Sequence, residues 1–260
     1  MTAIKAYIIS FAKDTERRAM LEERFSAIGL TPQFIDAVRG ADLPDADKAR
    51  FNGRARQSRL DHMMKDNAMG CALSHFDAWQ TIVANGEPGG FIFEDDAIPL
   101  RDDTLMLMAE LMRIADRLDI VSLANRRLKL KRALIHVIAP SAGLYALKGN
   151  DMGSEGYFIT ASAAQRMLRH PFRYGYELDR LIHHWWHHDC QVLHLLPPLF
   201  TEEGRPTSIG YDGLEPWSDD GPGIGLRRRL HRLRDSIAKR SRFASQVRAI
   251  RHRFAGVGGR

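Results

Sequence analysis

The chain has 260 residues with a formal net charge of +6, and 44% of them are hydrophobic, enough to bury one large domain, with or without an appendage. Two cysteines, Cys71 and Cys190, exclude a disulfide framework and a cysteine zinc cluster, and favour a reducing compartment. The sequence shows no signal peptide and no apolar run near the roughly 18 residues of a membrane span, so a cytoplasmic protein is expected.

The charge is unevenly distributed. Residues 226–260 hold 12 of the 38 Lys and Arg but one of the 32 Asp and Glu, which gives this tail a charge of +11. The first 225 residues hold the other 26 basic and 31 acidic residues, for a charge of −5. A catalytic function is therefore expected in the mildly acidic body, and the high isoelectric point comes from the tail.

The first elements form a β-loop-α-β unit. Residues 3–11 are apolar enough for a central strand that is buried on both faces. A helix is predicted from Thr15 to Ile28, ended by Gly29, and a second strand over 32–38. Such a unit is typical of open nucleotide-binding sheets. The absence of a G-x-G-x-x-G motif and of a P-loop disfavours dinucleotide and P-loop enzymes.

Arg17 and Arg18 follow the first strand, in the region where ligands of open α/β sheets bind. They are candidates to contact the base, ribose or phosphate of a nucleotide, and a solvated helix face is the alternative. Residues 39–67 are polar, charged and weakly periodic, so they are predicted to form a mobile excursion over the sheet edge.

Residues 68–83 are predicted to form a helix with a core-facing apolar stripe. The stripe consists of Met69, Leu73, Phe76, Trp79 and Val83. Ser74 and His75 lie beside it. A histidine in this position is more often a half-buried packing residue, and catalysis is the alternative.

The stretch 91–100 reads as a short buried strand that ends in three carboxylates, Glu94, Asp95 and Asp96. Within a strand, Glu94 and Asp96 would point to one face and Asp95 to the other. Like charges this close resist ionising together unless a cation lies among them, and oxygen ligands suit a hard divalent ion. The alternative is an acidic turn that caps the next helix.

Further elements follow along the chain. The predicted elements are a helix over 102–118, a strand over 119–123, a hairpin over 135–147, a strand over 153–160, a helix over 161–169 and a last strand over 191–200. A basic run after residue 123 is usually solvated, but could face an anionic acceptor. Its members are Arg126, Arg127, Lys129, Lys131 and Arg132. Residues 201–225 are rich in Gly, Pro and Asp and read as irregular.

A histidine-rich helix is predicted over 180–188, with Asp179 at its start. On this helix two histidine pairs would have the i, i+4 spacing that can bind a transition metal. The pairs are His183 with His187 and His184 with His188. No Glu follows the first His as a zincin motif requires, which favours a packing or surface role.

The tail over 226–260 carries apolar residues at helical spacing, with arginines on the other faces. A basic amphipathic helix of this kind suits an anionic membrane surface, and docking on the body is the alternative. No nucleic acid is expected as a partner, because the aromatic residues of a base-stacking surface are missing.

Several segments, in this order, resemble glycosyltransferase family 25, the lipooligosaccharide galactosyltransferase-like family of lipopolysaccharide biosynthesis. They are the opening strand with Thr15-Glu16-Arg17-Arg18, the Gly70-Cys71-Ala72-Leu73-Ser74-His75 helix with Trp79, Phe93-Glu94-Asp95-Asp96, Gly156 to Thr160 with Ala164 and Leu168, and Glu177 to Asp179. The resemblance covers roughly residues 3–210. The first strand ends in Ser10-Phe11 instead of the family's Asn-Leu pair, and the segment before Asp179 matches loosely.

The resemblance implies an α/β, GT-A-like (Rossmann-like) fold, with a mixed sheet flanked by helices, for the domain over residues 1–225. The basic helical tail over 226–260 lies outside the resemblance. It implies inverting transfer of a hexose, often galactose, from a UDP-sugar to a saccharide or glycolipid acceptor, usually with Mn²⁺ and otherwise with Mg²⁺. Location at the inner face of the membrane would suit such an acceptor.

The same mechanism assigns roles to the candidate residues. Asp96, with Glu94 or Asp95, would hold the metal ion. Asp179 would be the base that takes the acceptor's proton, with Glu177 in reserve. Two further groups complete the site. His75 and Ser74 would hold the donor sugar or orient the acidic strand, and Arg17 and Arg18 would contact the nucleotide.

Two other functions stay open at this stage. A catalytically inactive carbohydrate- or nucleotide-binding module on the same fold is the main alternative. A nucleotidyltransferase is disfavoured, because no glycine-rich, lysine-containing loop that could hold a triphosphate follows the first strand.

Overall fold

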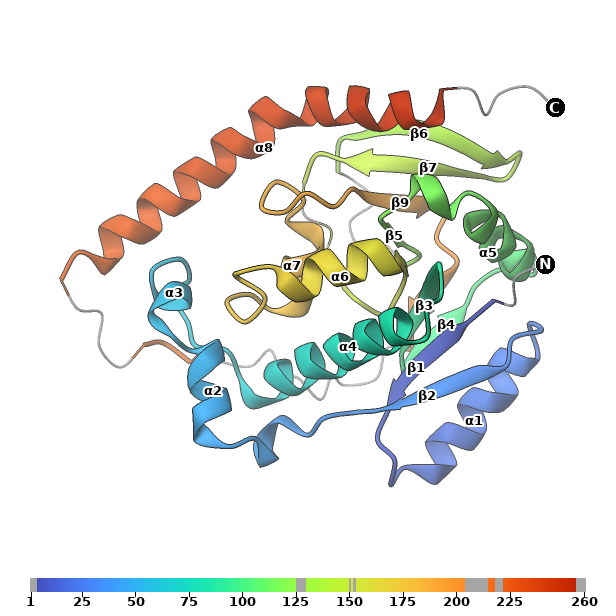
Figure 1. Cartoon of the computed structure of the whole chain (residues 1–260), viewed down its shortest axis with the longest axis horizontal. Coiled ribbons are helices and arrows are strands. Elements are labelled where there is room, and N and C mark those ends of the chain that lie inside the picture. Colours follow the sequence, from blue (N-terminus) through green and yellow to red (C-terminus); the bar gives the residue numbers. More distant parts are fainter. Residues whose placement is uncertain are drawn as a thin grey trace.

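The computed structural model describes residues 4–124, 130–149, 151, 153–203, 215–217 and 222–255. Its centre is an eight-stranded mixed sheet (Figure 1). In spatial order the strands are β2 (Pro32–Asp36), β1 (Ala6–Ser10), β3 (Gly89–Glu94), β8 (Gly156–Thr160), β5 (Ile120–Ser122), β9 (Val192–Leu196), β7 (Ala142–Leu147) and β6 (Arg132–Ala139). β2, β1, β3, β5, β9 and β6 run in one direction, and β8 and β7 run against them. The carboxyl ends of six strands therefore share one edge with the starts of β8 and β7.

Helices cover both faces of the sheet, as expected. One face packs against α1 (Thr15–Ser26), α5 (Thr104–Arg113) and the last turns of α8 (Ile224–Phe254). The other packs against α4 (Asp66–Ala84), α6 (Ala161–Arg169) and α7 (Leu178–His183). Within β1, Ala6 and Ile8 belong to the first core, and Tyr7 and Ile9 to the second. This alternation confirms a central strand that is buried on both sides.

The segment 39–67 differs from its prediction as a mobile excursion. It forms the 3₁₀ turn η1 (Gly40–Asp42) and the helices α2 (Asp45–Phe51) and α3 (Arg54–Gln57). Two of its side chains, Phe51 and Arg56, are almost fully buried. Phe51 packs into the core beneath α4, and Arg56 finds a carboxylate far along the chain, so tertiary contacts order a weakly periodic sequence.

Three other predicted boundaries are wrong. The helix over 102–118 is α5 followed by the 3₁₀ turn η2 (Ala115–Arg117), and the strand over 191–200 is divided into β9 and β10 (Phe200–Glu202). The helix over 180–188 ends at His183, so the two predicted i, i+4 histidine pairs do not form. The predicted basic residues at 126, 127 and 129 lie outside the described ranges. The hairpin over 135–147 is confirmed as β6 and β7.

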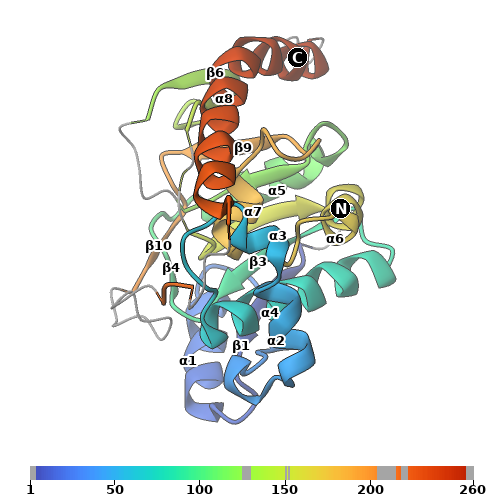
Figure 2. The same cartoon turned by 90° about the vertical axis from the view of Figure 1, so that its left-hand side faces the viewer.

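The basic tail forms the 31-residue helix α8, which crosses the molecule along one side (Figures 1 and 2). Its last turns dock on the body, where Val247, Ile250 and Phe254 are buried in the core beside β6. Nearer its start, apolar side chains remain exposed: Leu226, Leu230, Leu233 and Ile237. Among the described helices, none combines the length and apolar character needed to cross a membrane.

Candidate active site

The three consecutive acids lie where the sequence places them, at the carboxyl end of a central strand. Only Glu94 belongs to β3, however, and Asp95 and Asp96 form a turn into the short strand β4 (Ala97–Pro99). The predicted alternation of the three side chains along one strand is therefore wrong. The turn is fixed because β4 pairs with β10, and the Glu203 amide donates to the Asp96 carbonyl at 2.9 Å.

The acids of this turn are held in a low-dielectric and negatively charged setting. Burial raises the pKa of Asp96 to about 6, and the charges of Glu94 and Asp95 add to the effect. Burial also raises the pKa of Asp95, against the opposing charge of Arg17. The Oδ1 atom of Asp96 is buried and has no hydrogen-bond partner among the described residues. A divalent cation would satisfy this oxygen and restore both charges, so the residues fit a hard metal ion.

His75, on α4, is fully buried and faces Glu94. The Trp79 indole N–H donates to the Tyr157 hydroxyl at 2.8 Å, and that hydroxyl lies 2.9 Å from His75 Nδ1. The other ring nitrogen, His75 Nε2, lies 3.6 Å from Glu94 Oε1 and has no hydrogen-bond partner among the described residues. His75 is thus anchored through Tyr157, with its free nitrogen facing Glu94.

Glu94 and Cys71 complete the floor of the site. The Ser154 hydroxyl donates to Glu94 Oε1 and holds it from the segment before β8. Cys71 lies one helical turn before His75, and ligand atoms of Cys71, His75 and Glu94 lie within 4.8 Å of one another. Burial, followed by the charges of Glu94, Asp179 and Asp96, raises the pKa of the Cys71 thiol. The raised pKa keeps Cys71 a thiol, and a thiol is a poor metal ligand.

Asp179 and Glu177 differ sharply although they are two residues apart. Burial raises the pKa of Asp179 to about 6, and the charges of Glu177 and Glu94 contribute. Burial alone would raise the pKa of Glu177 too, but hydrogen bonding from His62 and the adjacent Arg56 lower it. Arg56 is fully buried and donates to Glu177, while His62 Nε2 lies 3.1 Å from the same oxygen. Opposite shifts in neighbouring acids indicate different roles.

The other predicted residues have varied surroundings. The Ser74 hydroxyl accepts from the Val38 amide at 2.8 Å and donates to the Gly70 carbonyl at 2.7 Å, so it braces the chain after β2. Arg18 donates to Asp36 at 2.6 Å and stacks on Phe34. Both lie away from the acidic turn. Arg17 lies closer: its guanidinium bonds Glu203 at 2.8 Å and is 3.9 Å from Asp95.

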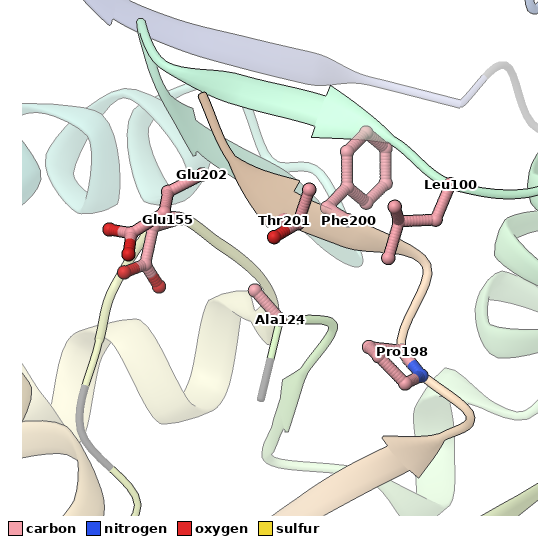
Figure 3. Close-up of a pocket in the computed structure, with 7 residues that line it drawn as sticks. All are labelled: Leu100, Ala124, Glu155, Pro198, Phe200, Thr201 and Glu202. Carbon is pink, nitrogen blue, oxygen red and sulfur yellow. The ribbon is translucent and has the colours of Figure 1, made fainter. Parts of the chain in front are cut away.

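A cavity of about 310 Å³ adjoins the acidic turn (Figure 3). It is lined by Leu100, Ala124, Glu155, Pro198, Phe200, Thr201 and Glu202. The carboxylates of Glu155 and Glu202 lie at the same end of it. Glu202 pairs with Ala97 across the two short strands, and its charge adds to the raised pKa of Asp96. The cavity and the acids are therefore parts of one region at the sheet edge.

The sequence predicted Glu94, Asp96, His75 and Asp179 as site residues, but it missed several of the residues that contact or surround them in the structure. They are Cys71, Ser154, Tyr157 and Arg56. Cys71 could have been found, because its i, i+4 spacing from His75 places both on one helix face. The other three have no such local signal, since their contacts span 60, 82 and 121 residues of sequence.

The sequence model of glycosyltransferase family 25 (LPS biosynthesis protein) matches residues 3–182. The matched segment includes α4, β3, and the acids Glu177 and Asp179 at the start of α7, but not α8. The acidic turn, His75, Glu177 and Asp179 thus lie within the matched segment, whereas four of the seven residues that line the cavity lie beyond it.

Several named proteins are similar to this chain. The lacto-N-neotetraose biosynthesis glycosyltransferase LgtE of Neisseria meningitidis is 28% identical over 170 residues, 62% of this chain and 59% of that protein. The lacto-N-neotetraose biosynthesis glycosyltransferase LgtB of Neisseria gonorrhoeae is 26% identical over 171 residues, again 62% of this chain and 59% of that protein. A Haemophilus influenzae protein is 28% identical over 166 residues, 62% of this chain and 56% of that protein. The matched part therefore spans less than two thirds of each relative's length.

Proposed function

Because the chain belongs to glycosyltransferase family 25, we propose that it is an inverting hexosyltransferase that uses a UDP-sugar, with galactose as the expected hexose. The acceptor would be a saccharide of a surface glycolipid or polysaccharide. The observation that carries the proposal is the acidic end of β3, where Glu94 lies within 4.8 Å of Cys71 and His75 and the buried Asp96 Oδ1 has no partner among the described residues. Burial raises the pKa of Asp96 and of Asp179 to about 6. The names of the two Neisseria relatives, which refer to oligosaccharide biosynthesis, support the substrate class.

The acidic turn is the proposed site of a divalent ion, Mn²⁺ or Mg²⁺. Asp96 would hold it with Glu94 or Asp95, because their oxygens are the ligands that hard cations prefer. When bound, the ion supplies Lewis-acid stabilisation of the charge that develops on the β-phosphate of UDP. The Ser154 hydroxyl donates to Glu94 and keeps that carboxylate in place, and His75 Nε2 lies 3.6 Å from it.

Asp179 is the proposed general base. Inversion by one displacement requires a group that takes the proton of the acceptor hydroxyl as the new bond forms. A pKa of about 6 suits this role, because the carboxylate is ionised at neutral pH and still basic enough to bind a proton. Glu177 is a weaker candidate, because Arg56 and His62 hold it and lower its pKa.

The donor's remaining contacts are assigned by position. Arg17 lies beside Asp95 and can reach a nucleotide bound at the strand ends. The adjoining cavity is proposed to hold a saccharide, because its threonine and two carboxylates can bond sugar hydroxyls. Arg18 and Ser74 are not needed for this proposal.

The test is release of UDP. Purified protein is incubated with UDP-galactose or UDP-glucose, with and without Mn²⁺, and free UDP is measured with and without a galactose- or glucose-ended oligosaccharide. Metal-dependent release that Asp96→Asn abolishes would support the proposal. Wild-type protein that binds UDP-hexose but releases no UDP with any acceptor would instead indicate an inactive binding module.

That second candidate is an inactive binding module on the same fold. A specific observation favours keeping it: a mouse protein named inactive glycosyltransferase 25 family member 3 is 28% identical over 96 residues, 35% of this chain and 16% of that protein. Thermal stabilisation by UDP-hexoses without turnover would identify such a module, because a ligand raises the melting temperature by mass action.

We also propose that α8 binds an anionic membrane surface, which would place the enzyme peripherally at the inner face of the membrane. The exposed stripe of Leu226, Leu230, Leu233 and Ile237 could enter the interface, and the arginines around it match anionic headgroups. The exposed stripe supports this role, while the docked last turns of α8 would hold the helix on the body.

A further inference from the structure

A cluster of histidines lies between α7 and α8, away from the acidic turn. His184 caps the end of α7, His187 follows in the next turn, and Asp235 projects from α8. One ligand atom from each of these residues lies within 4.8 Å of the others. Asp235 is 48 positions from His187 in sequence, so only the fold brings it to the two histidines.

The details of this cluster favour metal binding over simple packing. His187 Nε2 lies 2.9 Å from Asp235 Oδ1, and the His184 and His187 rings stack with centroids 5.4 Å apart. The Nδ1 atom of His184 is buried and has no hydrogen-bond partner among the described residues. An orphaned buried nitrogen costs free energy, and coordination of a cation would remove this cost.

We propose that His184, His187 and Asp235 form a Zn²⁺ site that fastens α8 to the loop after α7. Two imidazoles and one carboxylate are a common ligand set for zinc, which binds them at about 2.0–2.2 Å. Tetrahedral coordination at these lengths needs ligand atoms roughly 3.3–3.6 Å apart, so small side-chain rotations close the site. A water molecule completes the fourth position.

Neighbouring groups suit this role. His231 lies one turn before Asp235, with Nε2 3.6 Å from Asp235 Oδ2 and 2.9 Å from the Tyr176 hydroxyl. His231 thus lies beside both the carboxylate and His187, whose ring centroid is 5.6 Å from its own.

The site has a consequence for the rest of the molecule. The loop that would bind zinc continues directly from α7, which carries Asp179 in its first turn. A bound ion would tie this element to the first half of α8, whose apolar stripe is otherwise exposed. The inference does not depend on the proposed enzyme activity, because metal binding is measured without a sugar nucleotide.

The experiment uses the full chain without an affinity tag, stripped of metal with a chelator. Co²⁺ is titrated first, because tetrahedral Co²⁺ gives an intense visible spectrum, and Zn²⁺ is then added to displace it. We expect one strongly bound ion per chain, a tetrahedral spectrum and a raised melting temperature with Zn²⁺. Mn²⁺ should not displace the Co²⁺.

Variants locate the site. His187→Gln and Asp235→Asn should each weaken Zn²⁺ binding by more than the roughly 10–100-fold loss caused by removing a residue that only supports a ligand. His252→Gln, which changes an exposed histidine of the same helix, and Asp96→Asn, at the acidic turn, should bind Zn²⁺ as the wild type does. Circular dichroism confirms that each variant is folded, and Asp235→Asn provides a second measurement should His187→Gln unfold.

Two results would overturn the proposal. One is wild-type protein that gives only an octahedral Co²⁺ spectrum with no gain in melting temperature, which would leave the cluster as an ion pair between His187 and Asp235. The other is a tetrahedral spectrum that survives in both His187→Gln and Asp235→Asn, which would place the zinc elsewhere.

Discussion

The isosteric change Glu177→Gln tests most directly whether Glu177 and Asp179, the two acids at the start of α7, have different roles. It removes the charge that faces Arg56, whose guanidinium is fully buried and otherwise donates to the His62 and Gly175 carbonyls at 3.1 and 3.3 Å. Breaking a buried ion pair costs about 3–5 kcal/mol. Because the Glu177 side chain is 23% exposed, we expect the lower end, about 3 kcal/mol. For a domain of this size the melting temperature should fall by roughly 6–12 °C.

Thermal and urea unfolding measure this loss. Glu110→Gln is the matched control, because its carboxylate pairs with Arg113 at 2.7 Å on an exposed helix face. That pair should contribute less than about 1 kcal/mol to the free energy of unfolding. In UDP-release assays well below the melting temperature, Glu177→Gln should stay within about tenfold of wild type, whereas Asp179→Asn should lose about 10²–10⁴-fold.

The reasoning would be refuted if Glu177→Gln melted at the wild-type temperature, or if it lost turnover as severely as Asp179→Asn while remaining folded. The pH dependence gives an independent check. The pKa of Glu177 is lowered in the folded state, so its contribution to stability is complete above the unfolded value of about 4.3 and is lost as the pH falls below it. The stability difference between wild type and Glu177→Gln should therefore shrink below about pH 4.

Three further predictions address the metal, the base and the membrane. Asp96→Asn should abolish metal-dependent turnover and weaken Mn²⁺-dependent UDP binding, measured by calorimetry. Its melting temperature without metal should stay the same or rise, because burial disfavours the Asp96 charge. Retained turnover would remove this ion from the mechanism. At saturating Mn²⁺, kcat/KM should fall about tenfold per pH unit below pH 6 as Asp179 gains its proton, and Asp179→Asn should lack this limb; an unchanged limb would assign it to another group. Replacing Leu226, Leu230, Leu233 and Ile237 by Gln should reduce salt-sensitive sedimentation with anionic vesicles. The melting temperature should not fall, because these side chains are exposed. Equal sedimentation of variant and wild type would exclude a role of these four residues in membrane binding. Deleting the whole tail is a poorer test, because Val247, Ile250 and Phe254 belong to the core.

Local pattern was enough to predict most elements of this fold. The apolar run at 3–11, the helical stripe at 68–83 and the hairpin at 135–147 correspond to β1, α4 and the β6–β7 pair. These segments are long or strongly periodic, and their burial follows from the period of the side chains. The placement of the acids at a strand end followed from the apolar run before Glu94 and from the charge of the residues after it. Family resemblance then identified His75 and Asp179 as candidates.

The tertiary structure alone decided how these residues meet. Arg56 looked like one charge among many in a polar segment, yet the fold buries it against a carboxylate 121 positions away. That contact lowers the pKa of Glu177 and leaves Asp179 as the basic partner. The histidines after α7 have a helical spacing in sequence, but the helix ends at His183, so His187 meets Asp235 on α8 instead. Sequence patterns report which face of an element is apolar, whereas pKa values and ligand sets depend on distances between elements, which are fixed only when the core is packed.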